Sequence, residues 1–481
     1  MSIKDKENRQ VISAATVKGK IIPRNVPRIA WYALIMAWLA YATQIIARIG
    51  IFNIEPIYAS FYNLSPLLTL SIPAIWTMLA ATLSIPISNM SDRKGGGFHR
   101  RHYYLLFLTG YILILGLIAF KPIISSFAVF FTLLILSAII ASPLEPLIVA
   151  SAGDWFPIEH RGFALGFHHT GYPWGSLIGG FLISMLLIIF GKSNWPIVFL
   201  LPGSLAVILA IVLYKVFTLE NQRKLEIECQ KRGLHASLAH ELLPSEIKEE
   251  KKELGYREAF RLLLKNPTEL AMLIVGFLVT GAYWVWAGFL PLYLYYILHY
   301  PAAETAFLSV IFTATGGLGQ IIWGALSDRI GRKLSLIITT LWFALGVYVV
   351  VALAGLGLGV LIGAQLFAGL ATNATYPLMY AIGYDVADKR AKATSTAFID
   401  VAFYLGGALL FVTGYLIEVG GGYYSITGYL LNTYFLIGIL VGSAILTLVV
   451  ARETSGWFFK KDWSIFPRRM SNLPELEGES K

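Results

Sequence analysis

Charge is scarce in this chain of 481 residues. Asp, Glu, Lys and Arg make up 14% of it, apolar residues make up 57%, and the mean hydropathy is +0.67. A soluble domain carries roughly a quarter charged residues, so an ordinary soluble protein is excluded. The single cysteine, Cys229, excludes a disulfide framework within the chain. The chain also lacks a nucleophile elbow, a helical zinc motif and a phosphate loop, so we expect no enzyme, no cofactor and no bound metal.

Long apolar runs take the place of charge. A run of roughly 18 or more apolar residues is typical of a membrane-spanning helix. The runs are 29–54, 64–90, 103–121, 124–152, 162–190, 195–217, 268–297, 304–326, 334–354, 357–383, 393–417 and 427–450. They predict an all-α polytopic membrane protein with twelve transmembrane helices in two six-helix halves.

Polar stretches divide the chain into five segments. We expect an N-terminal tail at 1–28, a first half at 29–217, a linker with one or two surface helices at 218–267, a second half at 268–452 and a C-terminal tail at 453–481. The tail before the first span is basic and shows no cleavage-site pattern, so no secretory signal peptide is expected.

The net charge of +10 follows membrane topology. Lys and Arg gather in the tails, the linker and alternate loops, whereas the other loops offer only Lys121 and Lys192. This asymmetry is the positive-inside pattern, which predicts cytoplasmic termini and a multi-pass protein of the cell membrane, in contact with lipid and not with nucleic acid. We expect a monomer.

The two halves repeat each other in sequence. The string EPLIVASAGD at 145–154 matches YPLMYAIGYD at 376–385 with a constant offset of 231, and the string SDRKGG at 91–96 has an echo in SDRIGR at 327–332. Such parallel repeats are typical of secondary transporters, in which a central site lies between two halves that rock against each other.

The loop string WGALSDRIGRKLSL resembles a signature of the major facilitator superfamily, G-x-x-x-D-R-x-G-R-R/K. The resemblance covers essentially the whole chain and implies twelve spans, alternating access and a loop that helps to control the conformational switch. It assigns that role to the following residues: Asp92, Arg93, Gly95, Gly324, Asp328, Arg329, Gly331 and Arg332. The first copy departs from the signature, because Ser88 replaces the opening glycine and the basic pair is delayed to Arg100 and Arg101. The fourth span also lacks the arginine that many members supply.

Charged side chains inside the predicted spans are candidates for function, since a charge at a helix centre costs roughly 2.5–3.5 kcal/mol to insert. At about 1.5 Å per residue, Glu145 lies about 13 Å from Asp154 at the membrane edge, and Asp400 lies about 12 Å from Lys392. His169 lies at a similar depth, so all three are expected near the midplane. The alternative for Glu145 and Asp400 is a structural hydrogen bond to a neighbouring helix.

Offset pairs connect these midplane residues. His169 pairs with Asp400, and Glu145 pairs with Tyr376, at the same offset of 231. We therefore expect these four side chains to line a central cavity, with Tyr283 of the seventh span as a further candidate. Of the adjacent residues His168 and His169, only one can face the cavity, because neighbouring helical positions lie about 100° apart.

Arg48 has two interpretations. It lies twenty residues after Arg28, about 30 Å along a helix, which favours the outer membrane interface. A tilted or later-starting helix places it in the cavity instead, where its guanidinium is suited to bind a carboxylate or phosphate.

An arginine late in span 1 resembles the substrate arginine of the anion:cation symporter branch, as does the string DWFPIEHRGFALGFHHTG at the junction of spans 4 and 5. The resemblance implies proton-coupled symport of a small organic anion such as a carboxylate or sugar acid. Arg48 would then bind the anion, and Glu145 would carry the proton. The acidic residue expected before that arginine is Ala47 here, and the usual glutamate position of span 4 is near Ala141.

Two alternatives stay open. The glycines of span 5 resemble the pattern of proton-coupled drug antiporters, although Ser176 replaces its proline, and small residues in that span also favour close helix packing. A facilitator of a neutral solute is the second alternative.

Overall fold

The computed structural model describes residues 23, 25–94, 96–157, 160–237, 256–387 and 392–456, and every regular element in these ranges is a helix. Eleven helical segments of 23 to 31 residues among the described residues are long and apolar enough to cross a membrane. The predicted span at 195–217 corresponds to η5 (Lys192–Phe199) and α11 (Leu200–Val216), a helix of 17 residues. The predicted all-α polytopic class is confirmed.

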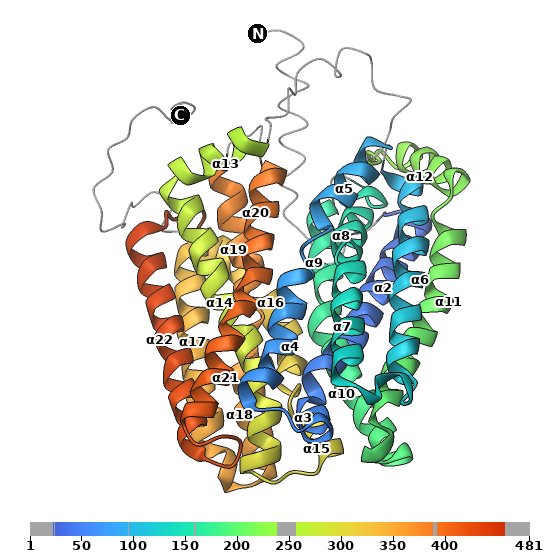
Figure 1. Cartoon of the computed structure of the whole chain (residues 1–481). Coiled ribbons are helices and arrows are strands. Elements are labelled where there is room, and N and C mark those ends of the chain that lie inside the picture. Colours follow the sequence, from blue (N-terminus) through green and yellow to red (C-terminus); the bar gives the residue numbers. More distant parts are fainter. Residues whose placement is uncertain are drawn as a thin grey trace.

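Two bundles of helices stand side by side (Figure 1). The first contains α2 (Arg28–Asn53), α3 (Glu55–Tyr62), α4 (Pro66–Leu79), α5 (Ser84–Arg93), η2 (Gly97–His99), α6 (Arg100–Ala119), η3 (Ile123–Ser125), α7 (Phe127–Ala141), α8 (Leu144–Asp154), α9 (Arg161–His169), α10 (Gly171–Phe190), η5 and α11. The second contains α14 (Pro267–Leu292), η7 (Tyr293–Ile297), α15 (Ala302–Leu308), α16 (Phe312–Ile330), α17 (Arg332–Leu353), η8 (Ala354–Leu356), α18 (Leu358–Thr372), α19 (Thr375–Val386), α20 (Lys392–Leu405), η9 (Gly406–Ala408), α21 (Leu409–Val419) and α22 (Ile426–Val450).

The linker contributes α12 (Leu219–Lys231) and α13 (Tyr256–Lys265), which lie on the same face of the molecule (Figure 1). We call this the linker face and the opposite one, which carries α3 and α15, the far face. A capped end starts the helix that follows α13. The side chain of Asn266 accepts hydrogen bonds from the amides of Thr268 and Glu269, at 3.1 and 3.4 Å, and Pro267 occupies the first helical position.

Several predicted spans are interrupted at mid-depth. Span 4 divides into α7 and α8 around Ser142 and Pro143, and span 10 divides into α18 and α19 at Asn373 and Ala374. The interruptions are related by the internal repeat. A short helix begins after each of them, and its first turn lies inside the bundle. Residues in that first turn can therefore project into the space between the halves.

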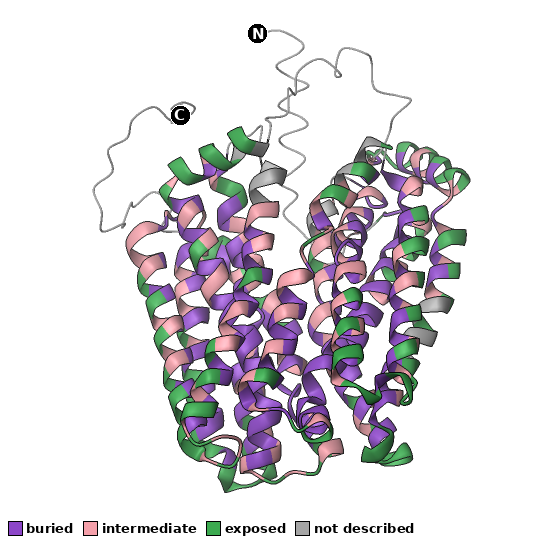
Figure 2. Cartoon of the chain, in the orientation of Figure 1, coloured by how far each residue is buried: buried purple, intermediate pink, exposed green. Residues whose placement is uncertain are grey.

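The outer surface of the two bundles is apolar. Figure 2 shows exposed residues along the outer helices and buried ones where the bundles meet. Large apolar side chains such as Leu106, Ile188 and Ile208 are 61–70% exposed. Exposed apolar surface on this scale is incompatible with water and typical of a surface that faces lipid.

The halves are joined at the far face. The described hydrogen bonds that cross between them there are Asn53 Nδ2 to the Ala306 carbonyl (2.7 Å), Tyr296 hydroxyl to the Pro56 carbonyl (3.3 Å), Ser65 Oγ to Glu418 Oε2 (2.8 Å), the Leu67 amide to Glu418 Oε2 (3.1 Å), Thr69 Oγ1 with the Tyr423 hydroxyl (2.5 Å), the Tyr423 hydroxyl to the Leu64 carbonyl (3.1 Å) and Lys192 Nζ to the Tyr295 hydroxyl (2.5 Å). We call these residues the far-face gate. At the linker face, by contrast, α5 and α8 stand apart from α13 and α20 (Figure 1).

Candidate functional site

A cavity lies between the two halves at the depth where the helices are interrupted. Both halves contribute to its lining, which consists of Tyr41, Arg48, Glu145, His169, Tyr172, Thr280, Trp284, Gln320, Tyr376, Pro377, Tyr380, Asp400, Phe403 and Tyr404. Five residues singled out from the sequence therefore meet in one place, although they come from α2, α8, α9, α19 and α20.

Arg48 lies in the cavity and not at the outer interface. Its residue is 3% exposed, and its guanidinium carbon lies 5.0 Å from the ring centre of Tyr172, 5.3 Å from that of Trp284 and 6.0 Å from that of Trp76. Cation–π contacts of this kind hold a planar guanidinium in place while its edge stays available for a hydrogen-bond acceptor. The helical distance of about 30 Å from Arg28 favoured the outer interface. That distance gives only the position of Arg48 along α2 and not which helices surround its side chain.

Glu145 occupies the first turn of α8. The Ser142–Pro143 interruption ends α7 just before it, and Pro146 is tolerated there because the first-turn amides have no partner within the helix. The position is the repeat partner of Tyr376, which occupies the first turn of α19. Both side chains line the cavity, so the offset of 231 reflects equivalent positions in the two halves.

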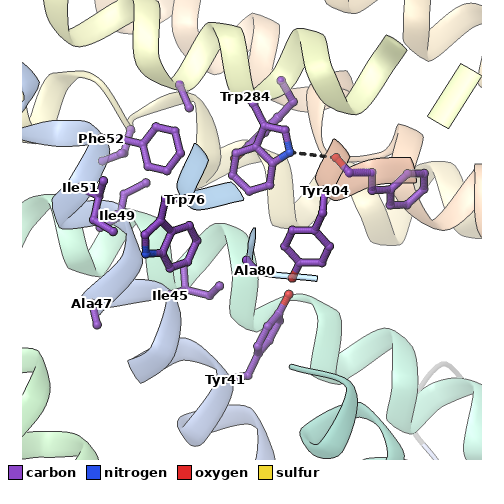
Figure 3. Packing of buried hydrophobic residues seen from close by; sticks show 14 of the residues in the cluster. Tyr41, Ile45, Ala47, Ile49, Ile51, Phe52, Trp76, Ala80, Trp284 and Tyr404 are labelled. Carbon is purple, nitrogen blue, oxygen red and sulfur yellow. Dashed lines mark hydrogen bonds between the residues drawn. The ribbon is translucent and has the colours of Figure 1, made fainter. Parts of the chain in front are cut away.

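The carboxylate of Glu145 is held by both halves. The Tyr41 hydroxyl of α2 donates to Oε1 at 2.7 Å, the Tyr404 hydroxyl of α20 donates to Oε2, and Arg48 Nη1 lies 3.7 Å from Oε2. Figure 3 shows the hydroxyls of Tyr41 and Tyr404 approaching the same point from opposite sides. This carboxylate is therefore a shared acceptor at the boundary between the halves.

Within the described part of the chain, Asp400 accepts a hydrogen bond from the Tyr380 hydroxyl at 2.5 Å. The ring of His169 lies 6.4 Å from that of Tyr380, so the repeat partners His169 and Asp400 face the same part of the cavity. His168 is fully buried and stacks on Tyr41 with ring centres 4.6 Å apart. His169 is thus the histidine that faces the cavity.

Tyr283 lies behind the cavity lining. Its ring is 5.7 Å from that of Tyr376 and 5.8 Å from that of Tyr172, so it supports two lining tyrosines. Its neighbour Trp284 lines the cavity instead, with its indole N–H donating to the Phe403 carbonyl at 3.1 Å (Figure 3).

Sequence reasoning missed most of the tyrosines. Tyr41 precedes Arg48 by seven residues, Tyr380 follows Tyr376 by four, and Tyr404 follows Asp400 by four. These spacings place each tyrosine on the helical face of a predicted site residue. The helical spacing of these tyrosines is visible in the sequence. It identifies them as cavity residues only when another residue on the same helical face is known to line the cavity.

An ion pair next to the predicted switch loop lies within each half at the linker face, and we call each of these pairs a latch. Gly95 and the side chains of Asp92 and Arg93 lie outside the described part of the chain. In the first half, Asp154 Oδ2 accepts from Arg100 Nε at 2.7 Å and from the Gly97 amide at 3.0 Å. The delayed arginine of the first loop copy therefore pairs with the acidic residue that ends span 4.

The second half carries the equivalent latch. Arg332 pairs with Asp385, the repeat partner of Asp154, and its Nη2 lies 3.3 Å from Asp328 Oδ1. Gly331, the N-cap residue of α17, has φ +120°, a conformation that favours glycine. Glu453 accepts from the amide of Lys333 at 3.0 Å. Gly324 has open space around its Cα, and Arg329 is exposed.

The chain is similar to known membrane transporters. The family model described as Major Facilitator Superfamily matches residues 34–308 and 272–469. Glucose-6-phosphate exchanger SLC37A2 of Danio rerio is 25% identical over 340 residues, which cover 65% of this chain and 65% of that protein. The "Probable sulfoacetate transporter SauU" of Cupriavidus necator is 25% identical over 328 residues, which cover 63% of this chain and 69% of that protein. The match thus spans about two thirds of each relative.

A solved structure supports the same fold. The inward-open xylose transporter XylE of E. coli superposes with a TM-score of 0.65 at 15% identity, covering 90% of this chain and 98% of that one. With the family match extending over most of the sequence, this chain belongs to the Major Facilitator Superfamily and is a multi-pass transporter, not an enzyme.

Proposed function

We propose that this transporter carries a small organic anion, a carboxylate or sugar acid, together with protons by alternating access. The observation that carries the proposal is the competition for Arg48. Its guanidinium is the cation among the cavity-lining residues, and Glu145 already lies against it at 3.7 Å. An entering anion and an ionised Glu145 therefore compete for one partner.

Protonation resolves this competition. A protonated Glu145 is neutral, so Arg48 is released to bind the substrate, preferably through two parallel N–H donors. Once the substrate leaves, Glu145 loses its proton and pairs with Arg48 again, which compensates the buried positive charge. Anion and proton thus enter and leave the cavity together, as symport requires.

The remaining lining fits a polyhydroxylated molecule. Tyrosine hydroxyls, Gln320 and Thr280 supply donors and acceptors around Arg48, and Trp284 supplies an apolar ring face. A few fixed polar groups on an otherwise aromatic wall are typical of a site for a small solute. His169, Tyr376 and Asp400 would contact the parts of the substrate away from the anionic group, with Tyr283 supporting them.

We also propose a membrane orientation and a cellular location for the transporter. We place the linker face in the cytoplasm, because Lys and Arg gather on the loops of that side. The far-face gate is then closed to the outside, so the conformation is inward-facing. We further propose the cell membrane as location, a monomer as the working unit, and the segment boundaries 1–28, 29–217, 218–267, 268–452 and 453–481.

Accumulation of radiolabelled anions in proteoliposomes under an imposed pH gradient tests the proposal. The panel contains a sugar acid, a sulfonate and a sugar phosphate, and the variants are Glu145→Gln and, as a control, Glu304→Gln, an exposed glutamate of α15. We expect the wild type and the control to accumulate an anion until a protonophore is added. Glu145→Gln should lose accumulation but keep exchange of internal for external anion.

Other outcomes identify the alternatives. Exchange of a sugar phosphate that ignores the pH gradient would contradict symport and assign an exchanger, the activity named for the relative in Danio rerio. Exit of a preloaded cationic compound as protons enter would assign an antiporter. Movement of a neutral sugar that follows its own gradient alone would assign a facilitator.

A further inference from the structure

Glu55 is a second buried carboxyl group, away from the cavity. It begins α3 directly after the first predicted span, and it is fully buried. Neither of its carboxyl oxygens has a hydrogen-bond partner among the described residues. A buried polar group without a partner is rare in folded proteins, and inside a membrane protein it points to a function.

The carboxyl group lies between the two halves. A Cβ atom added to Gly288 of α14 would lie 3.3 Å from Glu55 Oε1, and the same point is contacted by Leu70 of α4 and Leu410 of α21. Gly288 and Leu410 belong to the second half, whereas Glu55 and Leu70 belong to the first. The group therefore lies where apolar side chains of the two halves meet, and these side chains separate when the halves move apart.

Glu55 lies next to two residues of the far-face gate in the chain. The next residue, Pro56, accepts the hydroxyl hydrogen bond of Tyr296, and Asn53, two residues earlier, donates to the Ala306 carbonyl. Both bonds cross between the halves. Opening of the far face must break them and must expose the carboxyl group of Glu55 to water from that side.

The titratable groups that face Glu55 are tyrosines. Tyr58 comes from α3 itself, Tyr423 from the loop before α22, and Tyr429 from α22, and each interacts electrostatically with Glu55. Arg48 of α2 lies two turns earlier, against Glu145. Glu418 of α21 accepts hydrogen bonds from Ser65 and the Leu67 amide, and α4 presents Leu70.

Charge therefore decides whether the gate can close. An ionised carboxylate without a cation or a donor is very costly in an apolar enclosure, whereas the protonated acid costs only the loss of its hydrogen bonds to water. The closed gate thus takes the neutral acid, and an open gate filled with water allows ionisation at neutral pH.

We propose that Glu55 is a proton-binding site of the far-face gate, filled from the far side, whose occupation is required for the gate to close. The proton enters and leaves through the same side, because the site stays sealed from the linker face while the gate is shut. It therefore tunes the conformational equilibrium without adding to the protons transported per anion. This role depends on alternating access but not on Glu145 or on the identity of the substrate.

Proton linkage gives the direction of the pH dependence of gate closure. The closed gate binds one more proton than the open gate, so acid favours closure and rising pH favours opening. In the range between the two ionisation equilibria, the closed-to-open ratio should fall by up to about tenfold for each pH unit. Outside that range the ratio should become independent of pH.

Distances between spin labels on the full-length protein in lipid nanodiscs test the proposal. One label replaces Ser60 of α3 and the other replaces Thr427 of α22, both exposed near the far face, and Cys229 is changed to serine. The parent is expected to give the short distance at low pH and a growing long-distance population as pH rises. Glu55→Gln, which is always neutral, should keep the short distance at every pH.

Two further variants make the result specific. Glu418→Gln removes the other carboxylate of the gate, and we expect its pH response to persist. Glu145→Gln should also keep the pH response, so failure of the proposed symport mechanism would leave this test unaffected. The proposal is overturned if Glu55→Gln retains the pH response of the parent, or if the parent shows none between pH 5 and about 9, the range around a carboxyl group stabilised in its neutral form.

Discussion

Glu145 and Glu55 carry the same chemical group inside the same bundle, but their surroundings are opposite. Glu145 accepts from two tyrosines, one from each half, and lies against Arg48. Glu55 is buried near Leu70 and Leu410 and has no hydrogen-bond partner among the described residues. The comparison shows that a buried carboxyl group is defined by its partners: donors and a cation favour the charged form, and an apolar enclosure favours the neutral acid.

The largest effect is expected from removing the guanidinium that distinguishes the two sites. Arg48→Lys replaces a planar group stacked between Tyr172 and Trp284 with a compact ammonium that cannot form two parallel hydrogen bonds. The positive charge is kept, but the loss of two hydrogen bonds to a charged acceptor costs about 3 kcal/mol, so initial uptake should fall by about a hundredfold. The control is Arg101→Lys, since Arg101 also contacts an aromatic ring, Tyr214, but lies outside the cavity. Equal loss in both variants would show a general effect on folding.

Replacement of each glutamate by methionine tests the comparison directly. Glu145→Met leaves the hydroxyls of Tyr41 and Tyr404 and the charge of Arg48 without an acceptor, so we expect a loss of about 3 kcal/mol in stability. Glu55→Met removes a group that has no partner and should leave stability unchanged or increase it by about 1 kcal/mol. Thermal unfolding in detergent measures both. A similar fall in both midpoints would disprove the assignment of Glu55 as unpartnered.

The two latches at the linker face contain carboxylates that are more exposed, and we expect their contribution to stability also to depend on their partners. The side chain of Asp154 is 14% exposed and accepts from Arg100 and the Gly97 amide, whereas that of Asp385 is 28% exposed and pairs with Arg332. Asp154→Asn should cost about 2 kcal/mol, because charged hydrogen bonds are lost. Asp385→Asn should cost less than about 1 kcal/mol, as for surface pairs. Denaturation midpoints compared at equal salt give the ranking, which would be refuted if Asp385→Asn proved the more damaging.

The smallest effect is expected from a single donor. Tyr404→Phe removes one hydrogen bond to Glu145, worth about 1.5 kcal/mol, and leaves the bond from Tyr41 in place. Because the donor from Tyr41 remains, initial uptake should fall by no more than about tenfold, the factor that corresponds to roughly 1.4 kcal/mol. Tyr415→Phe, at an exposed tyrosine of α21, serves as the control and should keep the parent rate. A loss as large as that of Arg48→Lys would show that Tyr404 does more than donate one hydrogen bond.

The sequence by itself determined the class, the spans and the repeat. A chain with little charge and long apolar runs is expected to cross a membrane as helices, because a helix satisfies all its backbone hydrogen bonds within one segment. The offset of 231 paired Glu145 with Tyr376 and His169 with Asp400, and the structure places all four around the cavity. The repeat is visible in the sequence because the two halves have similar folds, so that residues at matching positions face the same cavity.

Only the tertiary structure decided which partners each group has. Arg48 was compatible with the outer interface or the cavity until the packing of α2 against α10 and α14 fixed its environment. The hydroxyl of Tyr404 reaches Glu145 across 259 residues of sequence, a separation that no local spacing indicates. Glu55, just beyond the predicted span, gave no signal, because its lack of partners is a property of the helices that enclose it and not of its neighbours in the chain.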